Sequence, residues 1–285
     1  MLHALVREAR ARLVSAGIAN EEAAMDAELL AREALGWDRP MFLARLMEEP
    51  PAGFEDRFQP LIERRARREP VAYICGTQEF WNRDFIVGPG VLIPRPETEF
   101  IIERALAWNG TRPAGATARV LDIGTGSGCL AITLALELPG ARVAATDISR
   151  EALDIARANQ SRWGTAVTFH EGPFLASADV PVDLLVSNPP YVTAADFAGL
   201  QPEVQIFEPI TALVSGADGL DAVREIVPIA ARALAPGGLF LMEIGFGQAD
   251  AVQRVIASTA GLRFMGFAED LQGIPRVAQA VPAGR

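Results

Sequence analysis

From residue 118 onward the chain alternates between short apolar runs and longer segments with helical periodicity. The apolar runs are "ARVLDIG", "ARVAATDI", "AVTFHEG", "VDLLVSN" and "GLFLMEIG", and the helical segments are "GCLAITLALEL", "REALDIARANQSRWG" and "AVREIVPIAARALAPGG". Strands that alternate with helices at this spacing run parallel, because each helix carries the chain back across the sheet. The alternation predicts an α/β fold with an open, doubly wound sheet. The run "LRFMGFAEDLQGIPRVAQAV" (262–281) predicts two last strands.

The region before this alternation divides into two predicted parts. Residues 1–70 repeat apolar side chains at three- and four-residue spacing, interrupted by "GWDRP" and "EEPPAG", which predicts about four short helices in a separate bundle domain. In residues 71–95, aromatic and β-branched residues form two runs broken by polar residues and by Gly88-Pro89-Gly90. That pattern predicts a β-hairpin-like connector. Residues 96–285 then form the α/β domain.

Composition restricts the partners and the chemistry that the chain can use. The formal net charge is −10, and the 26 basic residues are all arginines. An acidic chain is poorly suited to a phosphate backbone, and the basic cluster "ERRARREP" is interleaved with acids, as on a solvated helix face. Two cysteines and two histidines show no metal-ligand spacing, so no metal site is expected. No stretch has the pattern of a signal peptide or a membrane span, so we expect a cytoplasmic protein without membrane contact.

A glycine-rich turn follows the first strand of the predicted sheet. The segment "VLDIGTGSG" (120–128) places Gly124, Gly126 and Gly128 between that strand and a helix. Glycines let the backbone turn sharply and approach a ligand, toward which helix N-terminal amides can point. The spacing is G-x-G-x-G rather than the dinucleotide pattern G-x-G-x-x-G. A glycine loop alone is a weak signal, so a tight strand-to-helix turn remains the alternative.

Two aspartates strengthen the case for a ligand at this turn. Asp122 ends the first strand, and Asp147 ends the second, 19 residues after Gly128. An acid at the end of the second strand can accept hydrogen bonds from ribose hydroxyls. The pattern therefore predicts an adenosyl ligand, and NAD remains compatible with it. Alternatively, Asp147 caps the next helix, which begins near Ser149.

The fourth strand ends in an uncommon tetrapeptide. In "LLVSNPPYVT" (184–193) an apolar strand runs into Asn188, Pro189, Pro190 and Tyr191. Two prolines cannot continue a sheet ladder, and ligands of such sheets bind at the carboxyl ends of the strands. The proline carbonyls and the Asn188 side chain are acceptors that suit a planar NH₂ group, on which Tyr191 could stack. A generic turn after a strand is the alternative.

Such a holder suits methyl transfer to nitrogen. An amide or exocyclic nitrogen is a poor nucleophile because its lone pair is delocalised. Holding its two N–H groups out of their original plane localises that pair toward an electrophile. A sulfonium methyl group is such an electrophile and needs no metal, so orientation and electrostatics would do the work of a strong base.

These motifs resemble those of Rossmann-like S-adenosylmethionine-dependent amino-methyltransferases, which include DNA adenine-N6 and protein glutamine-N5 enzymes. Four further stretches of the sequence narrow the resemblance: "PVAYICGTQEFW" (70–81), "LIPRPETE" (92–99), "FEPITAL" (207–213) and "IPRVAQA" (274–280). With them the chain, from about residue 60 to its end, is similar to the HemK/PrmC family, the peptide chain release factor glutamine N5-methyltransferases. The "IPRPETE" segment is also more similar to the release-factor enzymes than to their ribosomal-protein paralogues.

The resemblance implies a class I methyltransferase fold with a mostly parallel seven-stranded sheet and a substrate-docking bundle. It implies methylation of the glutamine in the Gly-Gly-Gln loop of bacterial release factors during translation termination, giving N5-methylglutamine and S-adenosylhomocysteine. The implied catalytic and substrate-holding residues are Asn188, Pro189, Pro190 and Tyr191, with Arg95 and Glu97 also at the substrate. The implied cofactor-binding residues are Asp122, Gly124, Thr125, Gly126, Ser127, Gly128, Asp147, Pro173 and Asn188.

The chain departs from the family in one place. The family commonly shows an acid followed by an aromatic near the adenine, whereas "HEGPF" (170–174) has Gly172 and Pro173 there. We therefore expect Glu171 or Phe174 to take part in holding the adenine.

Alternative functions remain open at this point: a ribosomal-protein glutamine methyltransferase, a nucleic-acid adenine-N6 methyltransferase, or a noncatalytic binding module that works through its bundle. A nucleic-acid enzyme should carry a basic groove or an added recognition region, and neither is evident in this sequence. The complete tetrapeptide and glycine loop argue against a noncatalytic module. We expect a monomeric enzyme whose partner is a release factor and not nucleic acid.

Overall fold

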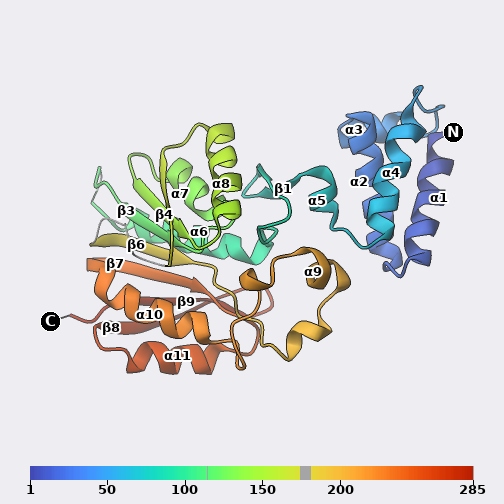
Figure 1. The fold of residues 1–285 in the computed structure, drawn as a ribbon. Helices are drawn as coiled ribbons and strands as arrows, with labels where there is room; N and C mark the ends of the chain where they lie inside the picture. The colour runs from blue at the N-terminus through green and yellow to red at the C-terminus, as the bar shows by residue number, and fades with distance from the viewer. Residues whose placement is uncertain (114, 174–180, 285) are drawn as a thin grey trace. The chain divides into compact units, whose positions relative to one another are not determined.

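The computed structural model describes residues 1–113, 115–173 and 181–284 (Figure 1). The chain folds into two compact units. The first comprises Met1–Thr77 and Gln201–Phe207, and the second comprises Gln78–Leu200 and Glu208–Arg285. A short segment from the middle of the chain therefore belongs to the N-terminal unit, which the division at residues 70 and 95 does not anticipate.

The first unit is helical. Its elements are α1 (Leu2–Ser15), α2 (Asn20–Leu35), α3 (Arg39–Arg45), α4 (Phe54–Ala66), α5 (Val71–Cys75) and α9 (Pro202–Phe207). Buried apolar residues at helical spacing, among them Leu13, Leu30 and Phe58, form its core. Helices α1 to α4 are those that the periodicity predicts, whereas α5 is a helical turn where the sequence predicts the start of the connector.

A buried arginine ties α9 to this unit. Arg65 on α4 is 1% exposed, and its guanidinium donates to Asp26 (2.6 Å), Glu22 (2.7 Å) and Glu203 (2.6 Å). Arg68 donates to the other oxygen of Glu203 at 2.7 Å. Burial alone would raise the pKa of Glu203, but the hydrogen bonds from both arginines outweigh it, and the pKa is lowered. Glu203 is therefore held as a carboxylate, and removing its partners would leave a buried charge unpaired.

In the described part of the chain, the second unit is built on a seven-stranded sheet with the order β5-β4-β3-β6-β7-β9-β8. The strands are β3 (Arg119–Ile123), β4 (Arg142–Asp147), β5 (Val167–Glu171), β6 (Val182–Ser187), β7 (Leu234–Glu243), β8 (Leu262–Glu269) and β9 (Pro275–Pro282). Strands β3 to β7 pair in parallel, and β9 is antiparallel to β7 and β8. The predicted mostly parallel α/β sheet is confirmed.

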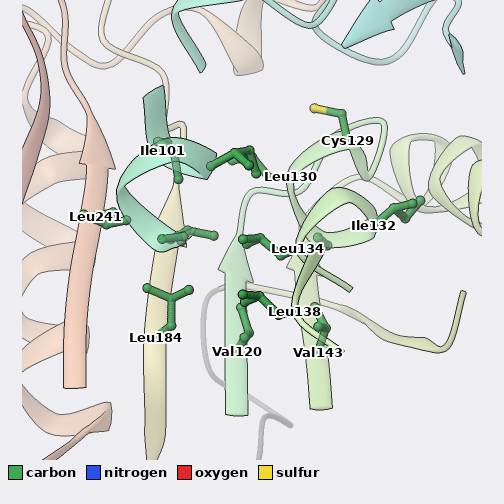
Figure 2. Packing of buried hydrophobic residues seen from close by; sticks show 14 of the residues in the cluster. Ile101, Val120, Cys129, Leu130, Ile132, Leu134, Leu138, Val143, Leu184 and Leu241 are labelled. Carbon is green, nitrogen blue, oxygen red and sulfur yellow. The ribbon is translucent and has the colours of Figure 1, made fainter. Parts of the chain in front are cut away.

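Helices cover both faces of this sheet. They are α6 (Glu99–Gly110), α7 (Cys129–Glu137), α8 (Arg150–Trp163), α10 (Asp221–Ala233) and α11 (Ala249–Ser258), with short 3₁₀ turns η1 (Pro96–Thr98), η2 (Asp196–Gly199) and η3 (Ile210–Ala212). Val120 and Leu184 pack on one face with Leu134 of α7 (Figure 2), whereas Leu121 and Leu185 pack on the other with α10 and α11. Because successive residues point to opposite faces, strands buried on both sides read as continuous apolar runs.

The strand order reverses where β3 and β6 lie side by side. Their register pairs Asp122 with Val186 and Ile123 with Ser187, so the glycine turn and the Asn188 tetrapeptide begin next to each other. The Ser187 hydroxyl donates to the carbonyl of Ile123 at 2.8 Å and joins the two strand ends. A reversal of this kind opens a crevice at the carboxyl ends of the strands, and this is where such sheets bind ligands.

Two other features bear on the sequence predictions. Strands β1 (Thr77–Phe80) and β2 (Arg83–Ile86) form the predicted hairpin, with Trp81 and Asn82 at positive φ, as a two-residue type I′ turn requires. The helix predicted for "AVREIVPIAARALAPGG" is too long, because α10 ends at Ala233 and the next residue pairs with β6 as part of β7. In the described residues, no helix is both long and apolar enough to cross a membrane.

Candidate active site

The carboxyl ends of β3, β4 and β6 border a pocket of about 330 Å³ within the second unit. The predicted site residues that line it are Gly124, Thr125, Gly126, Ser127, Asp147, Asn188, Pro189 and Pro190. Apolar side chains, including Val91, Leu130 and Ile148, line it as well. Its size and apolar lining suit a nucleoside-sized ligand. Residues of three separate motifs thus meet in one pocket.

Other predicted site residues are not part of the lining: Asp122, Gly128, Pro173, Tyr191, Arg95 and Glu97. Pro173 is exposed, while the preceding Gly172 does line the pocket. Glu171 lies exposed at the end of β5, with its carboxylate 3.3 Å from Arg150 Nε. Phe174 lies outside the described residues, so the expected adenine contacts of these residues stay predictions.

The three glycines of the turn have two different roles. Gly124 and Gly126 have φ angles of 72° and 55°, and a Cβ atom on either would meet nothing within 4 Å. Because both line the pocket, such an atom would occupy space available to a ligand. A Cβ on Gly128 would instead lie 3.0 Å from Ile132 Cδ1 and 3.1 Å from Ala156 Cβ. Gly128 therefore allows α7 and α8 to pack closely, which is a structural role that spacing alone does not distinguish from ligand binding.

Asp122 places a buried carboxyl group against the glycine turn. It is fully buried, and its Oδ2 accepts a hydrogen bond from Thr125 Oγ1 at 2.6 Å. Its Oδ1 has no hydrogen-bond partner within the described part of the chain. Burial is the main cause that raises the pKa of Asp122 to about 7. A cation bound nearby would favour the ionised form of Asp122 and would interact with the unpartnered Oδ1.

Asp147 connects the end of β4 to the glycine turn. One of its oxygens accepts from the N–H of Gly126 at 2.8 Å, and the other accepts from the N–H of Ser149 at 2.9 Å. Ser149 itself caps α8 by accepting from the N–H of Ala152 at 3.2 Å. The side-chain cap of the helix is therefore Ser149 and not Asp147. Asp147 remains a pocket-lining carboxylate that fixes the turn, and burial raises its pKa.

In the neighbouring part of the pocket lining, at the end of β6, the Asn188 amide is bonded on one side only. Its Nδ2 donates to Thr98 Oγ1 at 2.9 Å, and the Thr98 hydroxyl donates to Glu243 Oε2 at 2.6 Å. Tyr191 donates from its hydroxyl to Glu243 Oε1 at 3.4 Å. Asn188 Oδ1 is buried and finds no partner among the described residues. The site thus presents one unused acceptor beside two proline carbonyls.

Glu243 is an ionisable group in a buried place. It is 2% exposed, and burial, joined by the nearby charge of Glu97, raises its pKa to about 7 against the opposing hydrogen bonds from Thr98 and Tyr191. The pKa of Tyr191 is raised by burial and by the charge of Glu243. Tyr191 is consequently a hydrogen-bond donor at neutral pH, and its hydroxyl is directed to Glu243.

The "IPRPETE" loop is fixed by a second buried glutamate. Arg95 Nη2 donates to Glu208 Oε1 at 2.5 Å, and Glu208 Oε2 accepts from the N–H of Ile93 at 3.1 Å. Glu208 belongs to "FEPITAL", so two motifs far apart in the sequence meet here. The charge of Arg95 is largely neutralised by this pair, which makes the loop a scaffold for Thr98.

Several of these residues are not anticipated as part of the site. Thr98 lies inside a quoted motif and Glu243 ends a strand, as Asp122 and Asp147 do, so both carried a sequence signal. Asn159 carried none: its Oδ1 accepts from the N–H of Ile86 at 2.6 Å, and its Nδ2 donates to the carbonyls of Ile86 and Ser127, each at 2.9 Å. It is a support of the glycine turn that only the fold reveals.

Comparison with known proteins identifies the domains and supports the fold. A family model described as the PrmC N-terminal domain matches residues 4–76, and one described as the methyltransferase small domain matches residues 106–203. A methyltransferase structure from Pyrococcus furiosus, 17% identical, superimposes with a TM-score of 0.52 over 76% of this chain and 97% of that one, which supports the fold.

Curated relatives are more specific. A release factor glutamine methyltransferase of Geobacter sulfurreducens is 45% identical over 90% of this chain and 89% of its own length. One of Koribacter versatilis is 42% identical over 89% of each chain. Similarity of this degree over nearly the whole length shows that the chain belongs to the release factor glutamine methyltransferase family.

Proposed function

We propose that this protein transfers a methyl group from S-adenosylmethionine to the side-chain nitrogen of the glutamine in the Gly-Gly-Gln loop of bacterial class I release factors. The observation that carries the proposal is the unpartnered Oδ1 of Asn188, a residue that lines the same pocket as the glycine turn. The close relatives named for this activity support the same substrate. We also propose that the enzyme works in the cytoplasm as a monomer.

The residues of the glycine turn fit the proposed cofactor. When bound, S-adenosylmethionine supplies an electrophilic methyl carbon on a positively charged sulfur, and the electron pair of the broken bond stays on that sulfur. Gly124 and Gly126 leave open space in the pocket, and Asp147 offers a carboxylate to ribose hydroxyls. Asp122 Oδ1 has no hydrogen-bond partner among the described residues, and the ionised carboxylate would add negative charge near a cationic ligand.

The tetrapeptide part of the pocket lining would hold the accepting amide. Asn188 Oδ1 and the carbonyl of Pro189 are proposed to accept the two N–H groups of the glutamine. As the nitrogen forms its bond to carbon it becomes positive, so both hydrogen bonds strengthen toward the transition state. The excess proton then leaves to water. The residues therefore contribute orientation and electrostatic stabilisation.

A methyl-transfer assay with a matched substrate tests this function. The wild-type protein, incubated with radiolabelled cofactor, should label a recombinant release factor and should not label the same factor with the loop glutamine changed to alanine. Equal labelling of both factors would contradict the proposed acceptor.

We further propose that the N-terminal unit docks the folded factor. Deleting residues 1–70 alone is a poor test, because Glu203 would lose Arg65 and Arg68. Combining the deletion with Glu203→Gln removes the buried charge, and the full chain with Glu203→Gln is the matched control. The shortened protein should lose at least about tenfold more activity on the folded factor than on a Gly-Gly-Gln peptide, as expected when a separate docking surface supplies affinity. Equal losses on both substrates would refute docking by this unit.

A further inference from the structure

We propose that Thr98 and Glu243 are positioning residues that fix which way the Asn188 amide faces. The inference rests on the proposed function, in which Asn188 Oδ1 accepts an N–H group of the substrate. Neither residue would touch the reacting atoms. Their role is to keep the oxygen of Asn188, and not its NH₂ group, available to the substrate.

The need for such a device follows from the shape of an amide. The oxygen and the NH₂ group of asparagine are nearly equal in size, so the two orientations differ mainly in hydrogen bonding. With the amide turned over, Asn188 would present donors to the donors of the substrate NH₂. That arrangement removes a favourable contact and adds a repulsive one. Catalysis therefore needs one orientation to be strongly preferred.

The direction of hydrogen bonding is set at Glu243 and passes through Thr98. An ionised carboxylate can only accept, so the Thr98 hydroxyl must donate its hydrogen to Glu243 Oε2, over the 2.6 Å separation. The hydroxyl oxygen can then accept, which selects the Nδ2 side of Asn188 at 2.9 Å. Consecutive hydrogen bonds in a buried chain polarise and strengthen one another.

The three residues of this hydrogen-bond chain come from three distant segments, and its Glu243 end is also bonded to Tyr191. Thr98 ends η1, Asn188 follows β6, and Glu243 ends β7. Thr98 and Glu243 are each 2% exposed, so water cannot easily substitute for either partner. Tyr191 bonds to the second oxygen of Glu243, which restricts rotation of the carboxylate.

The charge of Glu243 makes the device sensitive to pH. The groups that act on it are Glu97, which raises its pKa, and Arg276 and the Thr98 and Tyr191 hydroxyls, which lower it. The buried thiol of Cys129 lies within its influence: burial, with a smaller contribution from the charge of Glu243, raises the pKa of that thiol to about 12. Burial dominates and brings the pKa of Glu243 to about 7. Above this pH the carboxylate enforces one direction. Below it, the protonated acid can donate to Thr98, and both directions become allowed.

Two substitutions at Thr98 and one control isolate the hydroxyl. Thr98→Val keeps the shape but removes the hydroxyl, and should lower kcat on a release factor at least about tenfold while cofactor affinity, measured by calorimetry, changes less than about twofold. Thr98→Ser restores the hydroxyl and should recover most of the turnover. Thr133→Val removes a hydroxyl that is equally buried and has no partner in the described residues, and should leave kcat unchanged.

The pH profile of Glu243→Gln tests the charge. Wild-type kcat should rise as the pH increases through about 7, as Glu243 ionises. The variant should be slower and should lack this limb. Asp122, whose pKa is also about 7, is unchanged in the variant, so a limb caused by Asp122 would persist and would overturn the assignment to Glu243.

Other results would also overturn the proposal. These are wild-type turnover in Thr98→Val, an equal loss in Thr98→Ser, or a loss of cofactor affinity in Thr98→Val, which would give the hydroxyl a purely structural role. If instead the wild-type protein transfers no methyl group to the factor, the proposed function itself fails.

Discussion

The pocket lining has two parts, which we call the glycine end and the Asn188 end after the motifs that form them, and the two are built differently. At the glycine turn, the lining includes Gly124 and Gly126, which contribute only backbone atoms and leave the space beside them open at positive φ. At the Asn188 end, the decisive atom is a side-chain oxygen, oriented by a chain of hydrogen bonds from two other segments. The first end is contiguous in sequence over a few residues. The second brings together positions 98, 188 and 243, which are separated by most of the domain.

This difference predicts different weaknesses. A backbone-lined site tolerates loss of side chains but is damaged by added atoms, because a Cβ enters the ligand's space. A site that depends on one oriented side chain is damaged by loss of a single polar atom, because a buried partner is left unpaired. Substitutions at the first end should change cofactor affinity, and substitutions at the second should change turnover.

The largest effect is expected at Asn188. Asn188→Ala should lower kcat by about a thousandfold, since it removes an acceptor that strengthens as charge develops on the substrate nitrogen. The dissociation constant of the cofactor, measured by calorimetry, should change less than about threefold. Near-normal turnover in this variant would remove Asn188 from the catalytic role.

The next effect tests the glycine turn. Gly126→Ala adds a methyl group to the pocket lining and should weaken cofactor binding at least about tenfold, with kcat at saturation less affected. Gly140→Ala is the control, because Gly140 also has positive φ (81°) and open surroundings but does not line the pocket. If both variants bind the cofactor equally well, open space at Gly126 has no part in recognition.

Asp147 should show an intermediate effect at the same end. Asp147→Asn keeps one oxygen for the N–H of Gly126 or of Ser149 but removes the charge and one acceptor. We expect cofactor affinity to fall about three- to tenfold, because the amide oxygen still accepts and the loss is then close to the roughly 0.5–1.5 kcal/mol net contribution of one ordinary hydrogen bond. Asp154→Asn, at an exposed carboxylate on α8, is the comparison variant. Identical affinities in the two variants would contradict a ribose contact.

The smallest effect is expected at Tyr191. Its hydroxyl lies 3.4 Å from Glu243, which is long for a hydrogen bond, and its ring is not part of the pocket lining. Tyr191→Phe should therefore reduce kcat less than about fivefold. A loss as large as that of Asn188→Ala would show that Tyr191 acts on the substrate directly and would weaken the contrast between an oriented amide and its supports.

Features of the fold and the site that are encoded by residues adjacent in the sequence could be predicted from it. Periodicity identifies the α/β sheet, and the glycine turn and the tetrapeptide are each a continuous motif. Because each motif follows a strand of that sheet, the strand order brings both to one pocket. The Asn159 support, the bond of Thr98 to Glu243 and the place of Glu203 within the N-terminal unit depend on pairings between residues far apart in the sequence. Their separations run from 32 positions, for Asn159 with Ser127, to 145, for Thr98 with Glu243. No local pattern contains such pairings.

Gly128 and Arg95 show that a motif can also suggest a ligand contact where the structure shows a supporting role. Each stands in a motif that implies a ligand contact, yet one allows two helices to pack and the other is paired with Glu208. A motif records which residues a site requires, but not which of them meet the ligand and which hold the others in place.

The most direct measurement is a mass-spectrometric map of the product. The protein would be incubated with S-adenosylmethionine and a recombinant release factor, and the digested factor would be searched for methylated peptides. We predict one added methyl group on the glutamine of the Gly-Gly-Gln peptide, absent when Asn188→Ala replaces the wild-type protein. A factor that stays unmodified, although cofactor binding is demonstrated in the same sample, would contradict the account.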